Sequence, residues 1–409
     1  MFFPADPLTW LLLAVISWLV LMLLIICSFS STLLALWREP VLRHPVLIVE
    51  SDDWGAGPLE QTGALHNLID TLSGYRDHQG HPALMTLAVV LSVADGNAVQ
   101  AAGKYQRLTL EDPIFSPLLE ALQSGVEKGV FALQLHGMEH YWPPSLMASR
   151  DANVQEWLRQ ETPQATEQLP AHLQSRWIDA VALPSKPLPE NAIRAAVQEE
   201  LVLYRTLFGA TPKVVVPPTF VWTDTVEQAC ATEGIKYVVT PGLRNNSRDA
   251  QGEPSGSSNE IRNGQTSFGL TYIVRDTYFE PVLGHTAETA LTALRDKTRL
   301  ARPCLLETHR KNFIEKGETA QRACLELSRL LHQALHQYPK LLFISTEHLG
   351  KAFNTQDSQW VEHRLSQRLM IMARRIAAVP RLGKLARMSG LSGLMRLGAK
   401  ALPSRTSTA

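Results

Sequence analysis

Short apolar runs alternate with amphipathic stretches over most of the 409 residues, and this alternation most narrows the folds that the chain can adopt. Repeated strand and helix patterns predict parallel strands joined by crossover helices. We therefore expect an α/β fold, a distorted (β/α) barrel of seven or eight parallel strands. The expected strands cover residues 46–50, 84–91, 130–135, 213–216, 236–239, 271–274, 304–307 and 341–344. The clearest expected helices cover residues 190–207, 223–232, 288–294 and 319–336.

An uncharged apolar stretch precedes this pattern. Residues 7–37 contain no Asp, Glu, Lys, Arg or His, and a bilayer core needs only about 20 apolar residues. A cleaved signal peptide is the alternative, but it has a basic start and a shorter apolar core. The flank here holds only Asp6. We expect an uncleaved transmembrane helix with a span of about residues 9–37, in an anchor segment 1–40.

Two weak signals place the body of the protein in the cytoplasm of a single-pass membrane protein. Arg38 and Arg43 follow the span, and basic residues beside a span tend to stay in the cytoplasm. The three cysteines beyond the span have no paired spacing, which suits a reducing compartment better than a disulfide framework.

The C-terminal tail is basic and amphipathic. Residues 364–409 carry ten Lys or Arg and no acid, which leaves 29 basic against 39 acidic residues, a net charge of −10, in the rest of the chain. One helical face holds Leu365, Leu369, Met372, Ile376 and Val379, with Arg364, Arg368 and Arg375 beside or opposite it. Such a helix either lies on an anionic membrane surface or packs on the barrel. We expect membrane lipids as partners, and no nucleic acid, because no nucleic-acid-binding motif accompanies the charge. The sequence points to no protein partner.

The expected organisation is therefore an anchor, a catalytic barrel over residues 41–355 and a tail over residues 356–409. Two segments interrupt the barrel pattern. Residues 143–189 are rich in Trp, Gln and Pro, and we expect them to form a cap or insertion beside the site. Residues 245–265 are polar and rich in Gly, Ser and Asn, which is typical of a surface loop.

Polar side chains follow three of the expected strands. Asp52 and Asp53 end the first strand. Because the side chains of neighbouring residues diverge, one of them could bind a metal while the other faces the ligand that the metal binds. His136 and His140, four residues apart, follow the strand 130–135 and can present both rings to one point. His309 follows the strand 304–307. A turn would explain each motif alone, but a barrel brings all three to one mouth.

Spacing alone is poor support for a metal site, as another pair shows. His332 and His336 have the same spacing within a polar helix, far from any strand end, and we interpret them as surface residues.

Four motifs in order resemble the polysaccharide deacetylase family, carbohydrate esterase family 4, over about residues 45–350. They are Glu50-Ser51-Asp52-Asp53-Trp54-Gly55, His136-Gly137-Met138-Glu139-His140, Val216-Pro217-Pro218 with Trp222, and Leu305-Leu306-Glu307-Thr308-His309. The resemblance implies a distorted (β/α) barrel that removes N- or O-acyl groups from sugars with a divalent metal, commonly zinc (Zn2+). By position it makes Asp53, His136 and His140 the metal ligands, Asp52 the general base and His309 the general acid.

The chain departs from the family at two positions. Gly137 stands where Ser or Thr usually follows the first metal histidine, and Val215 and Val216 stand where an Arg usually orients the base. Arg275 and Asp276, after another strand, could supply that cation and a carboxylate to tune His309. A surface ion pair is the alternative.

Several residues near the motifs are candidates for sugar binding. We expect Trp54, Tyr141, Trp142, Pro218 and Trp222 to form a sugar-stacking wall, with a place in the core as the alternative.

These motifs predict a membrane-anchored, metal-dependent hydrolase that removes an acyl group, an N-acetyl group above all, from a saccharide or lipid-linked sugar. A first alternative is a glycoside hydrolase that pairs Asp52 or Asp53 with Glu50 or Glu307. A second is a catalytically inactive carbohydrate-binding barrel, which the missing Arg suggests.

Overall fold

The computed structural model describes residues 6–315 and 317–402, and the chain divides into two compact units. The larger unit comprises His44–Thr298 and Pro303–Thr355 and contains every strand described below. The smaller unit comprises the residues up to Arg43, the segment Arg299–Arg302 and the residues from Gln356 onward.

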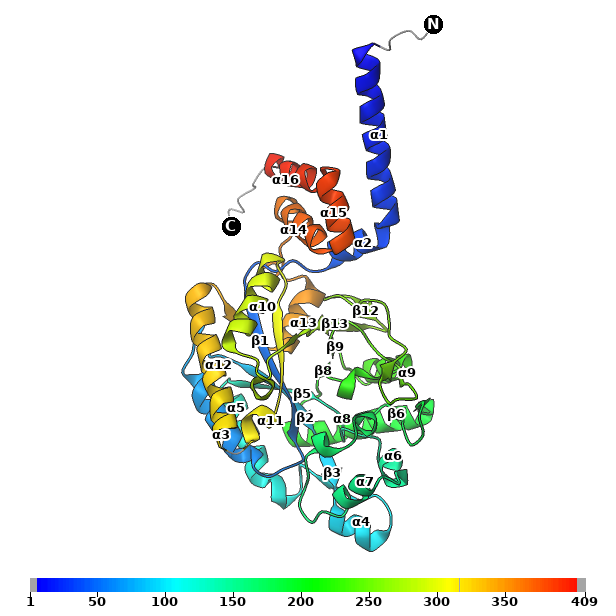
Figure 1. The fold of residues 1–409 in the computed structure, drawn as a ribbon. Coiled ribbons are helices and arrows are strands. Elements are labelled where there is room, and N and C mark those ends of the chain that lie inside the picture. The colour runs from blue at the N-terminus through cyan, green and yellow to red at the C-terminus, as the bar shows by residue number, and fades with distance from the viewer. Residues whose placement is uncertain (1–5, 316, 403–409) are drawn as a thin grey trace. The chain divides into compact units, whose positions relative to one another are not determined.

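One curled sheet forms the centre of the larger unit (Figure 1). Its order is β12-β13-β9-β8-β5-β2-β1-β15-β14, and β16 pairs with the start of β1. Only β12 and β13 pair antiparallel in it. The strands are β1 (Val46–Gly55), β2 (Met85–Val90), β5 (Phe131–Leu135), β8 (Val214–Val215), β9 (Tyr237–Thr240), β12 (Thr266–Ser267), β13 (Leu270–Val274), β14 (Thr277–Tyr278), β15 (Cys304–His309) and β16 (Leu342–Phe343).

The sheet confirms the expected α/β fold, and all eight expected strands form. It is a half-barrel, because no hydrogen-bonded pair among the described residues joins its edges at β12 and β14. The carboxyl ends of β1, β5 and β15 lie within one stretch of this curl, so side chains that follow them can meet.

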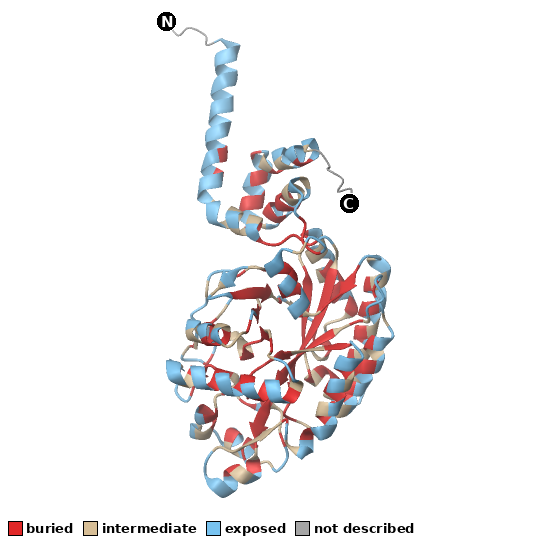
Figure 2. Cartoon of the chain, turned by 180° about the vertical axis from the view of Figure 1, so that it is seen from behind, coloured by how far each residue is buried: buried red, intermediate tan, exposed pale blue. Residues whose placement is uncertain are grey.

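Helices cover the outside of the sheet, and the apolar core lies between the two layers (Figure 2). The four expected helices are present as α8 (Glu190–Phe208), α9 (Asp224–Thr232), α10 (Ala287–Arg299) and α12 (Glu318–Gln337). The other helices of this unit are α3 (Gln61–Ser73), α4 (Gly96–Ala102), α5 (Ser116–Glu127), α6 (Pro143–Ala148), α7 (Ala152–Trp157), α11 (Lys311–Ile314) and α13 (Thr346–Thr355). Each long helix buries one apolar stripe and exposes a polar one.

Strand β1 is buried along all ten residues and carries an irregularity where the site begins. Its pairing with β2 shifts between Ser51 and Trp54, and Asp53 adopts a φ of 72°. Such a bulge re-aims the side chains beside it. Gly55 follows with a φ of 111°, and a Cβ there would lie 2.2 Å from the Val90 carbonyl oxygen, so only glycine fits.

The two segments that interrupt the strand pattern have structure of their own. Residues 143–189 contain α6, α7 and the ribbon of β6 (Ile178–Asp179) with β7 (Lys186–Pro187). Residues 245–265 contain the ribbon of β10 (Ser247–Arg248) with β11 (Pro254–Ser255). A third ribbon pairs β3 (Ser92–Ala94) with β4 (Arg107–Thr109).

The smaller unit consists of α1 (Pro7–Ser28), α2 (Ser30–Arg38), α14 (Leu365–Ala378), α15 (Pro380–Met388) and α16 (Leu391–Ala401). Among the described residues, α1 alone is a helix long and apolar enough to cross a bilayer, as an anchor or as a signal. The amphipathic helix expected in the tail is α14, and its apolar face packs against Ile25 and Leu36. That face is therefore covered by protein.

Candidate functional site

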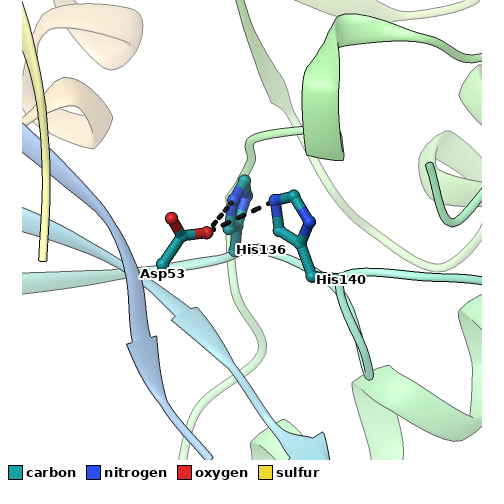
Figure 3. A group of neighbouring side chains, drawn as sticks. All are labelled: Asp53, His136 and His140. Carbon is teal, nitrogen blue, oxygen red and sulfur yellow. Dashed lines mark ion pairs between the residues drawn. The ribbon is translucent and has the colours of Figure 1, made fainter. Parts of the chain in front are cut away.

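Three side chains from β1 and from the loop after β5 meet at one point (Figure 3). One carboxylate oxygen of Asp53, Oδ1, lies 3.4 Å from His136 Nε2 and 3.3 Å from His140 Nε2. Their ligand atoms all lie within 4.8 Å of one another, and the three residues are buried. The structure thus brings together the three residues that the sequence proposes as metal ligands.

The donor set fits a divalent metal such as zinc. Oδ1 of Asp53 is buried and has no hydrogen-bond partner in the described part of the chain, although a buried carboxylate oxygen normally has one. His136 donates from Nδ1 to the Val216 carbonyl oxygen at 2.8 Å, which leaves Nε2 with a free lone pair. One carboxylate oxygen and two imidazole nitrogens are ligands that zinc accepts, with a position left open.

The loop that carries both histidines is held from behind by a buried arginine of the insertion. Arg176 contacts Glu139 at 2.5 Å and Glu200 at 3.0 Å, and the Met138 amide donates to the same Glu200 oxygen. Gly137 has a φ of 98°, and a Cβ there would lie 2.9 Å from Arg176 Cδ. Glycine is therefore favoured at this position by its positive φ and by the close approach of Arg176 and of the Glu139 carbonyl oxygen, also 2.9 Å away.

Arg275 holds the second acid of the β1 motif. Its guanidinium donates to both carboxylate oxygens of Asp52, at 2.8 and 2.6 Å, and to Glu50 at 2.8 Å. Burial alone would raise the pKa of Asp52, but Arg275 outweighs it and holds this pKa below the usual range. Asp52 thus stays ionised at neutral pH. Arg275 provides the positive charge beside Asp52 that was expected of it.

His309 approaches the same point from β15, and Glu280 fixes its ring. Nδ1 of His309 lies 2.6 Å from Glu280 Oε1. Burial would lower the pKa of His309, but the Glu280 hydrogen bond, with Asp53 and Asp52 nearby, raises it to about 10. The expected tuning carboxylate, Asp276, forms an ion pair with Lys297 instead. Asp276 follows Arg275 directly but is exposed, whereas Arg275 is buried.

A cavity of about 440 Å³ opens over these groups, a size typical of small-molecule sites. Asp52, Asp53, His136, His140 and His309 all line it. The insertion contributes Glu167 and Gln174, as expected of a cap beside the site. Apolar and aromatic surface comes from Pro217, Phe220, Tyr278 and Leu283.

None of the five residues expected to form a sugar-stacking wall lines this cavity. Trp54, Trp222 and Tyr141 are fully buried, Pro218 is buried and Trp142 is half-buried. Trp54 donates to Ser51 Oγ and Trp222 to Glu227, so their polar atoms are satisfied inside the core. Phe220 and Tyr278 occupy the cavity wall in their place.

The sequence reasoning missed Glu280, Arg176 and Glu167. Glu280 follows the short strand β14, which was not predicted, and this strand's end was the one signal that could have found it. Arg176 and Glu167 come from the irregular insertion, where no periodicity assigns positions. The second histidine pair, His332 and His336, is exposed on α12, as expected.

Comparisons with known proteins give a partial match to one family model and several solved structures of low similarity. A sequence model of glycosyl hydrolase family 57 matches residues 117–301, less than half of the chain, which include His136, His140 and Glu280 but not Asp52, Asp53 or His309. No curated protein matches the chain in sequence.

Solved structures similar to the chain at low identity include the following three. A 4-alpha-glucanotransferase from Thermococcus litoralis is 11% identical with a TM-score of 0.39; the alignment covers 76% of this chain but only 40% of that enzyme. A family 4 carbohydrate esterase from Streptomyces lividans is 12% identical with a TM-score of 0.35, covering 74% of this chain and 92% of that one. A peptidoglycan deacetylase from Bacillus subtilis is 11% identical with a TM-score of 0.35, covering 77% and 93%.

Replacing Gly137 with Ala tests the packing behind the histidine loop. A positive φ for alanine together with the 2.9 Å approach to Arg176 should displace the loop, at a cost of about 1–3 kcal/mol. We expect less bound zinc per chain by elemental analysis and a lower unfolding temperature. Gly63→Ala in α3, where nothing lies within 4 Å of the added carbon, is the matched control. Zinc content equal to that of the wild type would contradict this account of the loop.

Proposed function

We propose that the chain is a metal-dependent deacylase that removes an acyl group, an N-acetyl group above all, from a saccharide. The single observation that supports this best is the buried meeting of Asp53, His136 and His140 around an unsatisfied oxygen, with Asp52 and His309 on the same cavity. The resemblance of four ordered motifs to the polysaccharide deacetylases agrees with it.

Asp53, His136 and His140 would hold the metal. A divalent ion bound by such a set lowers the pKa of a coordinated water from 15.7 to about 7 and polarises a carbonyl. Asp52, kept ionised by Arg275, would accept the proton of the attacking water. His309, kept protonated by Glu280, would give a proton to the departing nitrogen. The two residues thus have opposite charge states, as a base and an acid require.

A charged partner holds each of the two proton-transfer groups in place. Arg275 is fully buried and touches Asp52 through two nitrogens, so the carboxylate cannot rotate freely. Glu280 is itself held by Asn312, which donates to its other oxygen at 2.5 Å. Fixed orientation of this kind favours proton transfer along one direction.

Glycoside hydrolysis is a second candidate, and specific observations favour it. The family 57 match covers part of the barrel. Asp52 and Glu307 both line the cavity, with carboxylate oxygens within 4.8 Å of each other, close to the roughly 5 Å of retaining glycosidases. Burial raises the pKa of Glu307 while that of Asp52 is lowered, and such a split suits an acid and a nucleophile. We prefer deacylation because the glycosidase assignment gives the Asp-His-His set no task.

The substrate we propose is a lipid-linked saccharide at the inner leaflet. Arg38 and Arg43 follow α1 and favour a cytoplasmic body, and a membrane anchor would keep the site near lipid headgroups.

Metal content and acetate release together test the proposed reaction. We expect wild-type protein to bind one zinc and to release acetate from N-acetylated chitooligosaccharides, and His136→Ala to lose both. Asp52→Asn should keep the zinc while turnover falls by about 10²–10⁴-fold. Elemental analysis and acetate assay are the measurements. Equal zinc in wild type and His136→Ala, or glycosidic cleavage that survives a chelator, would favour the second candidate.

The pH profile tests the acid. Because Glu280 raises the pKa of His309 to about 10, His309 is protonated at neutral pH and its acid function is lost only as pH rises toward that value. Removing the charge with Glu280→Gln should lower this pKa, so the alkaline limb of kcat/KM should move to lower pH. Asp276→Asn, which removes a carboxylate paired with Lys297, is the control and should leave the limb in place. An unmoved limb in Glu280→Gln would exclude His309 as the acid.

Membrane sidedness tests the substrate. A reporter active only in the cytoplasm, fused to the C-terminus, should be active, and a reporter active only after export should be inactive. The reverse pattern would direct the search to an envelope or exported polysaccharide.

A further inference from the structure

The two ends of the chain pack together in the smaller unit. Ile25 of α1 and Leu36 of α2 share one buried cluster with Met372, Ile376, Leu382 and Ala386 of α14 and α15. Trp18 of α1 donates from Nε1 to the Ser389 carbonyl oxygen, between α15 and α16, at 2.8 Å. The tail therefore covers one side of α1 from Trp18 to its C-terminal end.

A buried arginine ties the same elements together. Arg375 of α14 is 1% exposed and donates to carbonyl oxygens at the end of α2, in the segment that follows α2 and in the segment Arg299–Arg302. The acceptors are Leu36, Glu39, Pro40, Leu300 and Ala301. The carbonyls of Leu36, Glu39 and Pro40 lie in or just after the last turn of α2, where a cation is favoured.

This packing bears on whether α1 stays in the mature protein. Removal of α1 as a signal would uncover the apolar side chains of α14 and α15 that pack on Ile25. Exposure of such an apolar cluster to water is unfavourable. The buried cluster of the tail thus includes α1.

The tail has a second apolar surface that faces outward. Its exposed members, which we call the tail face, are Leu385 and Met388 of α15 and Leu394 and Leu397 of α16, with exposed fractions between 37% and 77%. Interspersed with them are the exposed cations Arg381, Lys384, Arg387, Arg396 and Lys400. Residues 364–409 contain no acid. Apolar side chains mixed with cations match the acyl chains and phosphates of an anionic leaflet.

The position of the tail along α1 points to the same partner. With a rise of about 1.5 Å per residue, Trp18 lies roughly 15 Å from Ser28 along the helix axis, near its middle. A bilayer that surrounds α1 must then also receive the turn between α15 and α16, where Met388 is 77% exposed.

We propose that α1, α2 and α14–α16 form one membrane-embedded unit, in which α1 is retained and the tail face inserts into the anionic leaflet around the C-terminal half of α1. The inference is independent of the reaction in the larger unit. It makes the C-terminal tail a part of the anchor.

A labelled full-length chain tests this. Cys27, exposed, and Cys324, half-buried, are first replaced by Ser, and Cys230 and Cys304 are buried and stay. Met388→Cys or Leu397→Cys then carries an environment-sensitive fluorophore, and the protein is reconstituted in vesicles that contain phosphatidylglycerol. We expect blue-shifted emission and quenching by nitroxide-labelled lipid, several-fold stronger than for a label at Gln359→Cys, an exposed polar position in the same unit.

A second variant tests the charges. Lys384→Gln combined with Arg396→Gln and Lys400→Gln should weaken the quenching in anionic vesicles and leave it unchanged in phosphatidylcholine vesicles. Water-like emission at Met388 equal to that at Gln359 would overturn the proposal. So would a blue shift without lipid quenching that depends on protein concentration, since a second copy would then cover the face. An intact mass that lacks α1 would overturn the retained helix.

Discussion

The ion pair of Arg275 with the acids of β1 is the interaction on which the larger unit's site depends. Glu50, Asp52 and Glu307 come from neighbouring strands and are all buried. Three buried carboxylates without a cation would lose their hydration and repel one another. Arg275, with no exposed surface, lies within 3.2 Å of all three. The site therefore keeps three buried carboxylates together because the guanidinium of Arg275, directly after β13, pairs with all of them.

The bulge in β1 assigns different tasks to two neighbouring acids. In a regular strand Asp52 and Asp53 would face opposite sides of the sheet. With Asp53 at a φ of 72°, its carboxylate turns toward the histidine loop while Asp52 faces Arg275. Both acids thus line one cavity but have different neighbours. Asp52 is paired with Arg275, whereas Asp53 keeps a carboxylate oxygen without a hydrogen-bond partner among the described residues. A backbone irregularity of this kind is typical of functional sites.

In the smaller unit, too, a buried charge is stabilised by the polar groups around it. Arg375 is a buried cation, and it is tolerated because five carbonyl oxygens accept its protons and the Glu39 carboxylate lies 3.6 Å from its Nη1. The amphipathic pattern of α14 was thus a correct sign of a helix, but its arginines do not all face solvent. Charge alone could not tell which of them the fold would bury.

The sequence by itself determined the order of strands and helices, the strand ends that carry Asp52, Asp53, His136, His140 and His309, and the apolar helix α1. These features are local, because periodicity and turn residues act over a few neighbours. Only the tertiary structure decided that Glu280 rather than Asp276 meets His309, that Arg176 of the insertion supports the histidine loop, and that Trp54 and Trp222 lie in the core. Such contacts join residues far apart in the chain. They depend on the curvature of the sheet and on where the irregular insertion packs. Neither produces a periodic pattern in the sequence.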